Sequence, residues 1–316
     1  MLVLFQNAII YNPFLPPNAR SMQISEFARQ CGGVEWREDR IKSLDGTEIA
    51  LCISEVSSGD GRGSSNKLAT PVYILYFQGN ASSLPPRLPD ISGILRQLRT
   101  VTEGQVHYTV VCLSYRGYWT SHDRPSEKGI NLDSEAALRW ISKLHQDRYQ
   151  DAQVAVPNPV TILWGQSIGC GFATNLAAKI QDAATLSLNA LVLETPFTNT
   201  RAMLTALYPQ KWLPYRHLWP FLRNHLDSWE NLGVIATKSQ KPGVYIVEAG
   251  KDELVPSDHG GILYQRCQAV QLFAELHTVR GALHNDVMVR REGKHTIARS
   301  IALAVSRAQD GQADQK

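Results

Sequence analysis

A serine lies between two glycines in the segment 161–171, where Gly165, Ser167 and Gly169 form the pattern G-x-S-x-G. The pattern directly follows an apolar run and directly precedes a stretch with helical spacing. A turn this sharp between strand and helix strains the serine backbone, and side chains at the two glycines would collide with neighbouring elements. The strain presents the hydroxyl at the edge of a sheet, beside the free N–H groups of a helix N-terminus. The pattern therefore predicts that Ser167 is a nucleophile.

A serine hydroxyl is a poor nucleophile until a base takes its proton, so a histidine and an acid are expected downstream. Of the nine histidines, His284 follows the apolar run 273–279, which we expect to be the last strand. The turn after the last strand is where we expect the base that takes the serine proton. His259 near a helix start, His277 inside the strand and His295 in the terminal helix are better explained as structural residues.

The acid is expected just after the apolar run 244–248, where Asp252 lies. With Asp252, the three groups follow one another along the chain in the order serine, aspartate, histidine, a known order for this kind of triad. Glu194 and Asp286 are the competing acids. Aspartates that follow strands are often turn formers, which is the structural alternative for Asp252.

Acyl transfer also needs N–H donors directed at the developing oxyanion. One is expected from the backbone of Ile168, directly after the nucleophile. The second is expected from Asn80, in the loop 77–82 that follows the first central strand. Gly79 lets the backbone of this loop come close to the reacting carbonyl.

The elements that position these residues can be read from the spacing of apolar residues. Segment 34–56 alternates apolar and polar residues around Asp45 and Gly46, which predicts an antiparallel hairpin. Beyond it, short apolar runs alternate with stretches of helical spacing, which predicts an α/β fold with a mostly parallel sheet and helices on both faces. We expect strands at 72–77, 108–114, 160–164, 190–194 and 244–248 and helices at 91–101, 134–144, 168–180 and 261–270.

We divide the chain into an N-terminal segment 1–33, an α/β domain 34–308 and a disordered tail 309–316. The domain contains an insertion at about 198–241 that lacks the signal of a buried strand. The insertion predicts a small helical cap over the carboxyl ends of the strands.

Six aromatic residues lie within 208–229, among them Trp212 and Trp219, and three basic residues lie between them. We expect Trp212 and Trp219 to contact substrate from the cap. The alternative is a helical hairpin whose aromatic residues pack on the body of the domain, and the two interpretations are compatible.

The composition excludes several classes of protein. The chain has 316 residues, 43% of them hydrophobic and 19% charged, as in ordinary globular proteins. A net charge of +3 is too small for a nucleic-acid binder that works by releasing counterions. The five cysteines form no CxxC pair, and no G-x-x-x-x-G-K-[ST] loop occurs. We therefore expect buried structural cysteines, no metal, no cofactor and no nucleic-acid partner.

The apolar start of the chain, 1–5, is far shorter than the roughly 20 residues that span a bilayer. It also lacks the basic region and cleavage site of a signal peptide. We expect a cytoplasmic or peripheral membrane location, with contact between the protein and a membrane surface left open.

Several further motifs follow one another along the chain from about Phe5 to Ser306. They are Phe77-Gln-Gly-Asn-Ala81, Tyr115-Arg-Gly-Tyr118, Arg124-Pro-Ser-Glu-Lys-Gly129, Gly165-Gln-Ser-Ile-Gly169, Asp252-Glu-Leu-Val-Pro256 and His284-Asn-Asp286. With these motifs the chain resembles the α/β-hydrolase serine enzymes that include monoacylglycerol and lysophospholipid lipases and acyl-protein thioesterases, most of all their fungal relatives with an FHGNA loop. The resemblance implies that Ser167, Asp252 and His284 form the triad and that Asn80 and Ile168 form the oxyanion hole.

The chain departs from the family pattern at three positions. Gln78 replaces a histidine, Ser114 an aspartate and Trp119 a glycine. None of these changes removes a triad group, so hydrolysis is still expected. We expect Trp119 to narrow the acyl pocket. Family members often carry a membrane anchor upstream of the match to Phe5, so we expect that the chain either lacks the anchor or starts incomplete.

These observations predict a metal-independent serine hydrolase that cleaves an ester or thioester of a small lipophilic acyl substrate. One alternative is a peptidase or a hydrolase that releases or trims a metabolite, because the same triad cleaves amides and thioesters. The non-enzymatic alternative is a catalytically silent binding protein with the same fold.

Overall fold

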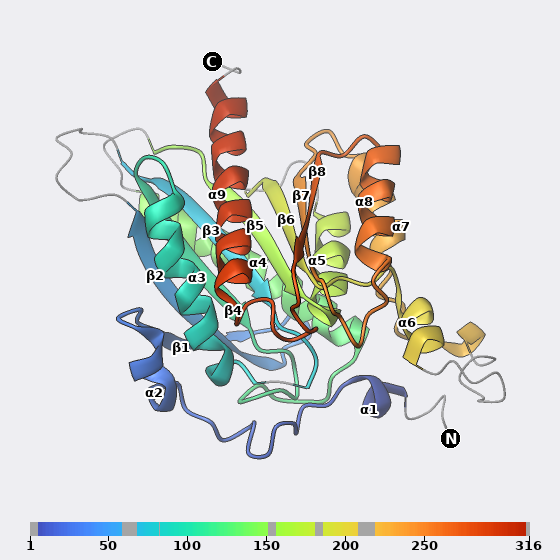
Figure 1. Ribbon diagram of the computed structural model, residues 1–316. Coiled ribbons are helices and arrows are strands. Elements are labelled where there is room, and N and C mark those ends of the chain that lie inside the picture. Colours follow the sequence, from blue (N-terminus) through green and yellow to red (C-terminus); the bar gives the residue numbers. More distant parts are fainter. Residues whose placement is uncertain are drawn as a thin grey trace.

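The computed structural model of the chain describes residues 6–58, 68–81, 83–150, 156–180, 186–207 and 219–313. An eight-stranded sheet runs through these ranges, with strand order β1-β2-β4-β3-β5-β6-β7-β8 (Figure 1). The hairpin β1-β2 and the pair β2-β4 are antiparallel, and the remaining pairs are parallel. The strands are β1 (Arg37–Lys42), β2 (Glu48–Ser58), β3 (Thr70–Phe77), β4 (Val106–Leu113), β5 (Val160–Gln166), β6 (Leu188–Glu194), β7 (Gly243–Ala249) and β8 (Ala274–Val279).

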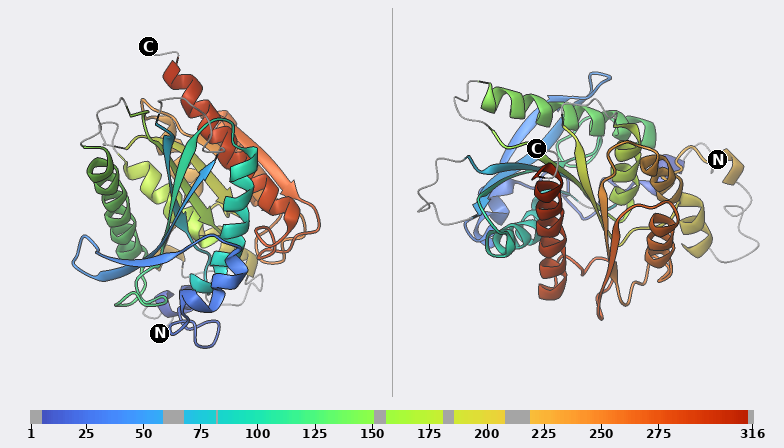
Figure 2. Two further views of the ribbon diagram at one scale, coloured as in Figure 1. Left: turned by 90° about the vertical axis from the view of Figure 1, so that its left-hand side faces the viewer. Right: turned by 90° about the horizontal axis from the view of Figure 1, so that it is seen from above.

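Helices cover both faces of the sheet (Figure 2). One face carries α3 (Leu88–Val101) and α9 (Arg291–Ala313), and the other carries α4 (Glu127–Tyr149), α5 (Ile168–Lys179), α7 (Ser228–Ala236) and α8 (His259–Ala269). All residues of the central strands β3 and β5 are buried, as expected for strands covered on both sides. The shorter elements are α1 (Gln6–Ile10), α2 (Ile24–Phe27), η1 (Ala28–Cys31), η2 (Pro85–Arg87), α6 (Thr200–Leu207) and η4 (Trp219–Phe221).

The predicted hairpin, strands and helices are confirmed, with shifted ends. The largest shift is at α4, which begins at Glu127 rather than at 134. Its start is fixed by Ser126, whose hydroxyl accepts a hydrogen bond from the N–H of Gly129 at 3.1 Å. The five cysteines are buried and free, also as predicted.

The expected disordered tail from 309 onward is wrong for 309–313, because α9 continues to Ala313. The side-chain amide of Gln309 donates to the hydroxyl of Thr70 at the start of β3, 3.0 Å away. The polar composition of 309–316 predicted a disordered tail because it gives no sign of this contact with the body of the domain. Residues 314–316 lie outside the described ranges.

The insertion 198–241 contains α6, η4 and α7, while 208–218 lies outside the described residues. Helix α7 packs against α5 and α8 and buries Leu232 and Ile235 in the core. The second half of the insertion therefore belongs to the helical layer of the body through aliphatic residues, whereas the aromatic Phe221 and Trp229 are exposed. Helix α6 lies to one side (Figure 1). Among the described residues, no helix is long and apolar enough to cross a membrane.

Candidate active site

Ser167 occupies the turn between β5 and α5 in a strained conformation. Its φ of 52° and ψ of −117° lie in a region that non-glycine residues rarely adopt. A Cβ at Gly165 would lie 2.5 Å from the backbone nitrogen of Cys170, and one at Gly169 would clash with the carbonyl oxygen of Phe77. These contacts give the physical reason for both glycines of the pattern.

The structure brings His284 and Asp252 to Ser167. His284 Nε2 lies 2.8 Å from the Ser167 hydroxyl oxygen, and His284 Nδ1 lies 2.8 Å from Asp252 Oδ2. The side chains of His284 and Asp252 are only 5% and 6% exposed. With the ring proton on Nδ1, the imidazole donates to the carboxylate and accepts from the serine hydroxyl. This is the arrangement that a general base requires.

Asp252 is held as a carboxylate. Burial favours the neutral acid, but the hydrogen bonds from His284 and from the backbone N–H groups of Val255 and Leu254 outweigh it and lower the pKa of Asp252 below its usual value. Its other oxygen, Oδ1, accepts from the backbone N–H groups of Leu254 and Val255 at 2.9 and 2.8 Å. Next to it, Glu253 accepts from the backbone N–H of His284 at 2.9 Å. The turn after β7 thus fixes both the acid and the backbone of the base.

The competing acids have other partners. Asp286 accepts from the Leu283 N–H and pairs with Arg290, each at 3.4 Å, so it stabilises its own turn. Glu194 ends β6 and is fully buried behind the nucleophile, where its backbone oxygen accepts from the N–H of Ser167 at 2.8 Å. Burial raises the pKa of Glu194 to about 7. Neither carboxylate contacts an imidazole within the described residues.

The remaining candidate histidines, His259, His277 and His295, make no contact with Ser167 or Asp252 in the described residues. His259 begins α8 and its Nδ1 accepts from the Thr198 N–H at 3.4 Å. His277 lies in β8 beside Glu275, 2.9 Å away. His295 is exposed on α9. No group of three or more His, Cys, Asp or Glu in the described part of the chain is placed to hold a metal ion.

The loop after β3 brings Asn80 to the carboxyl edge of the sheet, where Ile168 begins α5. The Asn80 side chain is the centre of a hydrogen-bond network. Its Oδ1 accepts from the Tyr118 hydroxyl at 2.7 Å, the Ala81 N–H at 2.8 Å and the Asn12 N–H at 3.2 Å. Its Nδ2 donates to the Ile10 carbonyl. Four partners hold this side chain, and through it the loop that carries the predicted backbone donor.

Gly79 and Gln78 fit the loop between neighbouring strands. A Cβ at Gly79 would lie 3.2 Å from the Gln166 side-chain oxygen, so the loop packs tightly against the end of β5. The carbonyl of Gln78 accepts from the Tyr115 hydroxyl at 2.7 Å. A glycine at position 79 therefore allows the loop to pack against the end of β5.

The N-terminal segment ties this loop to the insertion. The Gln6 amide donates to the Phe221 carbonyl at 3.2 Å and its oxygen accepts from the Arg223 N–H at 2.6 Å. The side chain of Asn224 donates to Asn7 at 2.8 Å and accepts from the Tyr11 hydroxyl at 3.0 Å. Sequence reasoning missed these roles, because more than 200 positions separate the partners.

The structure places Trp119 in the core, and the narrowing of an acyl pocket by this residue stays a prediction. Trp119 is 1% exposed, packs in the core beside β3 and β5, and donates from its indole to the Met22 carbonyl at 2.7 Å. Its φ of 40° explains why a glycine suits this position, since that region disfavours side chains. Trp219 begins η4, and Trp212 lies outside the described residues.

A buried arginine that sequence reasoning did not single out fixes the loop after β4. Arg116 donates to both carboxylate oxygens of Asp133, at 3.1 and 2.7 Å, and to Asp45 at 2.8 Å. Its side chain is 5% exposed and that of Asp133 is fully buried. The signal was present in the Tyr115-Arg-Gly-Tyr118 motif, but nothing in the spacing identifies the partners.

The fold has counterparts among solved structures. An esterase from Pyrococcus furiosus matches with a TM-score of 0.59 at 14% identity, over 90% of this chain and 93% of that one. An esterase from Pyrobaculum calidifontis matches with a TM-score of 0.57 at 16% identity, over 96% and 98%. These matches show that the chain has the α/β-hydrolase fold.

No family model matches the chain. Among curated proteins, it is 28% identical to protein bem46 of Schizosaccharomyces pombe over 67% of its length and 61% of that protein. It is 27% identical to the α/β hydrolase domain-containing protein WAV2 of Arabidopsis thaliana, over 85% and 78%. It is 33% identical to the lysophosphatidylserine lipase ABHD12 of Danio rerio, over 60% and 46%. The chain thus spans about half to three quarters of these relatives.

Proposed function

We propose that the protein is a serine hydrolase that cleaves a carboxylic ester or thioester of a lipophilic acyl substrate. The observation that carries the proposal is the position of the His284 ring, with one nitrogen 2.8 Å from the Ser167 hydroxyl and the other 2.8 Å from Asp252. The two contacts join a nucleophile, a base and an orienting acid in one chain of hydrogen bonds.

In this mechanism Ser167 Oγ attacks the carbonyl carbon while His284 Nε2 takes the hydroxyl proton. The negative charge moves to the carbonyl oxygen, which accepts from the backbone N–H groups of Ile168 and Asn80. The intermediate collapses, the alcohol or thiol leaves with the proton from His284, and an acyl ester remains on Ser167. Water, deprotonated by His284, then attacks this ester. The second intermediate collapses, Ser167 Oγ leaves with the proton from His284, and the carboxylic acid is released.

Asp252 stabilises the imidazolium that forms in both steps. Its lowered pKa keeps it charged at neutral pH, and its position fixes the tautomer of His284 that can accept the serine proton. The two backbone N–H groups on its other oxygen keep the carboxylate from rotating away from the imidazole.

The lipophilic substrate is supported by the relatives. ABHD12 is named a lysophosphatidylserine lipase, and the structural counterparts are named esterases. The same reasoning extends the proposal to a peripheral contact between the protein and a membrane surface, where such substrates reside.

The test is a fluorophosphonate probe together with nitrophenyl esters of increasing acyl length. We expect the wild-type protein to be labelled and to turn over esters, and Ser167→Ala to lose labelling and about 10⁴-fold or more of kcat. Ser257→Ala, at a serine in the turn before α8, is the control. A wild-type protein that neither labels nor turns over would favour a silent binding protein.

Comparison of kcat/KM for matched oxyester, thioester and amide substrates separates the proposal from the peptidase alternative. We expect the amide to be the poorest of the three. A preference for the amide would contradict the proposal.

A further inference from the structure

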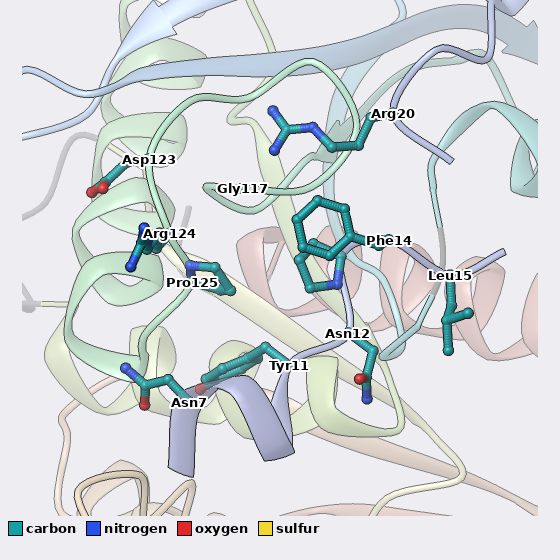
Figure 3. A pocket seen from close by; sticks show the side chains of 11 residues that line it. Asn7, Tyr11, Asn12, Phe14, Leu15, Arg20, Gly117, Asp123, Arg124 and Pro125 are labelled. Carbon is teal, nitrogen blue, oxygen red and sulfur yellow. The ribbon is translucent and has the colours of Figure 1, made fainter. Parts of the chain in front are cut away.

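A cavity of about 750 Å³ lies between the N-terminal segment and the loop that follows β4. Figure 3 shows Tyr11, Asn12, Phe14 and Arg20 reaching it from the N-terminal segment, and Asp123, Arg124 and Pro125 from the loop. The mechanism above uses none of these side chains.

The wall of this cavity contacts the elements that carry the reaction. The ring of Tyr11 packs on Phe172 in α5, the helix that starts directly after Ser167, with ring centroids 6.4 Å apart. The backbone N–H of Asn12 donates to the Asn80 side chain at 3.2 Å. A molecule in the cavity would therefore contact Tyr11 and Asn12, which in turn contact α5 and the loop of the proposed oxyanion donor.

The cavity presents two guanidinium groups without carboxylate partners among the described residues. Arg20 donates to the Ser121 carbonyl at 3.1 Å, which leaves further N–H donors on its planar group. Arg124 is exposed and makes no ion pair in the described ranges. The acidic side chain at the cavity, Asp123, is paired with Arg116 at 3.4 Å, so its charge is partly offset. A guanidinium group can donate two parallel N–H hydrogen bonds to two oxygens of one phosphate or carboxylate group.

The rim of the cavity is apolar and solvent-exposed. The side chains of Phe14 and Leu15 are 70% and 51% exposed, which is costly for two neighbouring large apolar residues unless they meet a partner. An amphiphile offers both kinds of contact, with an anion for the arginines and a hydrocarbon part for the rim.

We propose that this cavity is a subsite for the anionic head group of a lipid ester substrate, bound through its phosphate or carboxylate by Arg20 and Arg124. The inference rests on the proposed function, because it assumes that the ester of the same molecule reaches Ser167. It adds the class of substrate that the site prefers: acyl esters with a negatively charged head group over neutral ones.

The experiment compares two substrates with the same acyl chain, an acyl-glycerol phosphate and the neutral monoacylglycerol. The variants are Arg20→Gln, Arg124→Gln and their combination. The control is Arg139→Gln on α4, which removes an exposed arginine that does not line the cavity. We expect the double variant to lose about tenfold or more in the ratio of kcat/KM for the charged over the neutral substrate, mainly through KM. We expect the control to keep the wild-type ratio.

An unchanged ratio in the double variant would overturn the subsite. Failure of the proposed function is a different result, since then the wild-type protein hydrolyses neither substrate. In that case binding of glycerol 3-phosphate and of inorganic phosphate, measured by calorimetry, still tests the cavity. Tighter binding of glycerol 3-phosphate that is lost in the double variant supports it. Equal binding of both anions would assign the site to free phosphate and overturn the head-group proposal.

Discussion

The turn around Ser167 and the loop around Asn80 lie at the same edge of the sheet but are held in different ways. The Ser167 turn is fixed by the backbone, because Gly165 and Gly169 allow contacts that any side chain would block. The Asn80 loop is fixed by side-chain hydrogen bonds to Tyr118 and to the N-terminal segment. A short sequence motif is enough to predict a geometry that local steric contacts set. It is not enough to predict a geometry that depends on hydrogen bonds to distant residues.

The largest effect is expected where the backbone sets the geometry. In Gly169→Ala the new methyl group would overlap the Phe77 carbonyl oxygen, so strand and helix must separate. We expect a loss of about 1–3 kcal/mol in unfolding free energy and about 100-fold in kcat, because the nucleophile moves. Urea denaturation and ester hydrolysis measure the two.

Gly261→Ala in α8 is the matched control, because no atom lies within 4 Å of its added Cβ. It should be neutral or slightly stabilising. Equal behaviour of the two variants would contradict the role assigned to sterics in the Ser167 turn.

Glu194 makes the region behind the Ser167 turn sensitive to pH. Its pKa of about 7 lies above the usual value, so the folded chain holds a proton that the unfolded chain has released. Stability should therefore fall as pH rises from about 5 to about 7, and then level off. Over this range we expect the free energy of unfolding of the wild-type protein to fall by roughly 2 kcal/mol more than that of Glu194→Gln, as measured by urea denaturation.

The exposed Glu292→Gln on α9 serves as the control for removal of one carboxylate. If wild type and Glu194→Gln show parallel pH profiles, the buried carboxyl does not hold its proton in the folded state.

The side-chain network of the other region gives a smaller effect. Asn80→Ala keeps the backbone N–H but removes all four side-chain hydrogen bonds, so the loop is free to shift. We expect kcat to fall about tenfold or more, since a misplaced oxyanion donor weakens the transition state, with little change in KM.

The exposed Asn158→Ala provides the comparison for an asparagine outside the network. A change in KM alone would argue that Asn80 contacts the substrate rather than positioning the loop.

The smallest effect is expected from Tyr118→Phe, which removes a single bond of 2.7 Å to Asn80. A loss of about 1 kcal/mol in unfolding free energy and a few-fold drop in kcat are expected. If this variant is as impaired as Asn80→Ala, one hydrogen bond and not the network holds the loop.

Much of the fold could be predicted because its signals are local. The buried runs that became β3 and β5 are mostly apolar, and the hairpin turn at Asp45 and Gly46 has strong turn residues. The same applies to Ser167, whose flanking glycines and neighbouring strand and helix are contiguous in the chain. The chain order also brought His284 and Asp252 into consideration before their contacts were visible.

The rest depends on contacts that spacing does not encode. The hydrogen bonds between the Asn80 side chain and the backbones of Ile10 and Asn12 join residues about 70 positions apart. Nothing in the sequence around these residues indicates that they pair. Trp119 replaces a glycine of the family pattern, and nothing in the sequence indicates that its side chain is buried and donates to the Met22 carbonyl. Which core an aromatic residue joins is a property of the packed molecule.

The attachment of Gln6 and Asn7 to 221–224, and of Asn12 to the loop of Asn80, has a practical consequence for preparing the protein. An affinity tag in front of α1 would sit at the carboxyl edge of the sheet, whereas the end of α9 lies at the opposite edge (Figure 1). Purification handles, fluorophores and surface anchors therefore belong on the C-terminal side, where they leave the edge that carries Ser167 unobstructed.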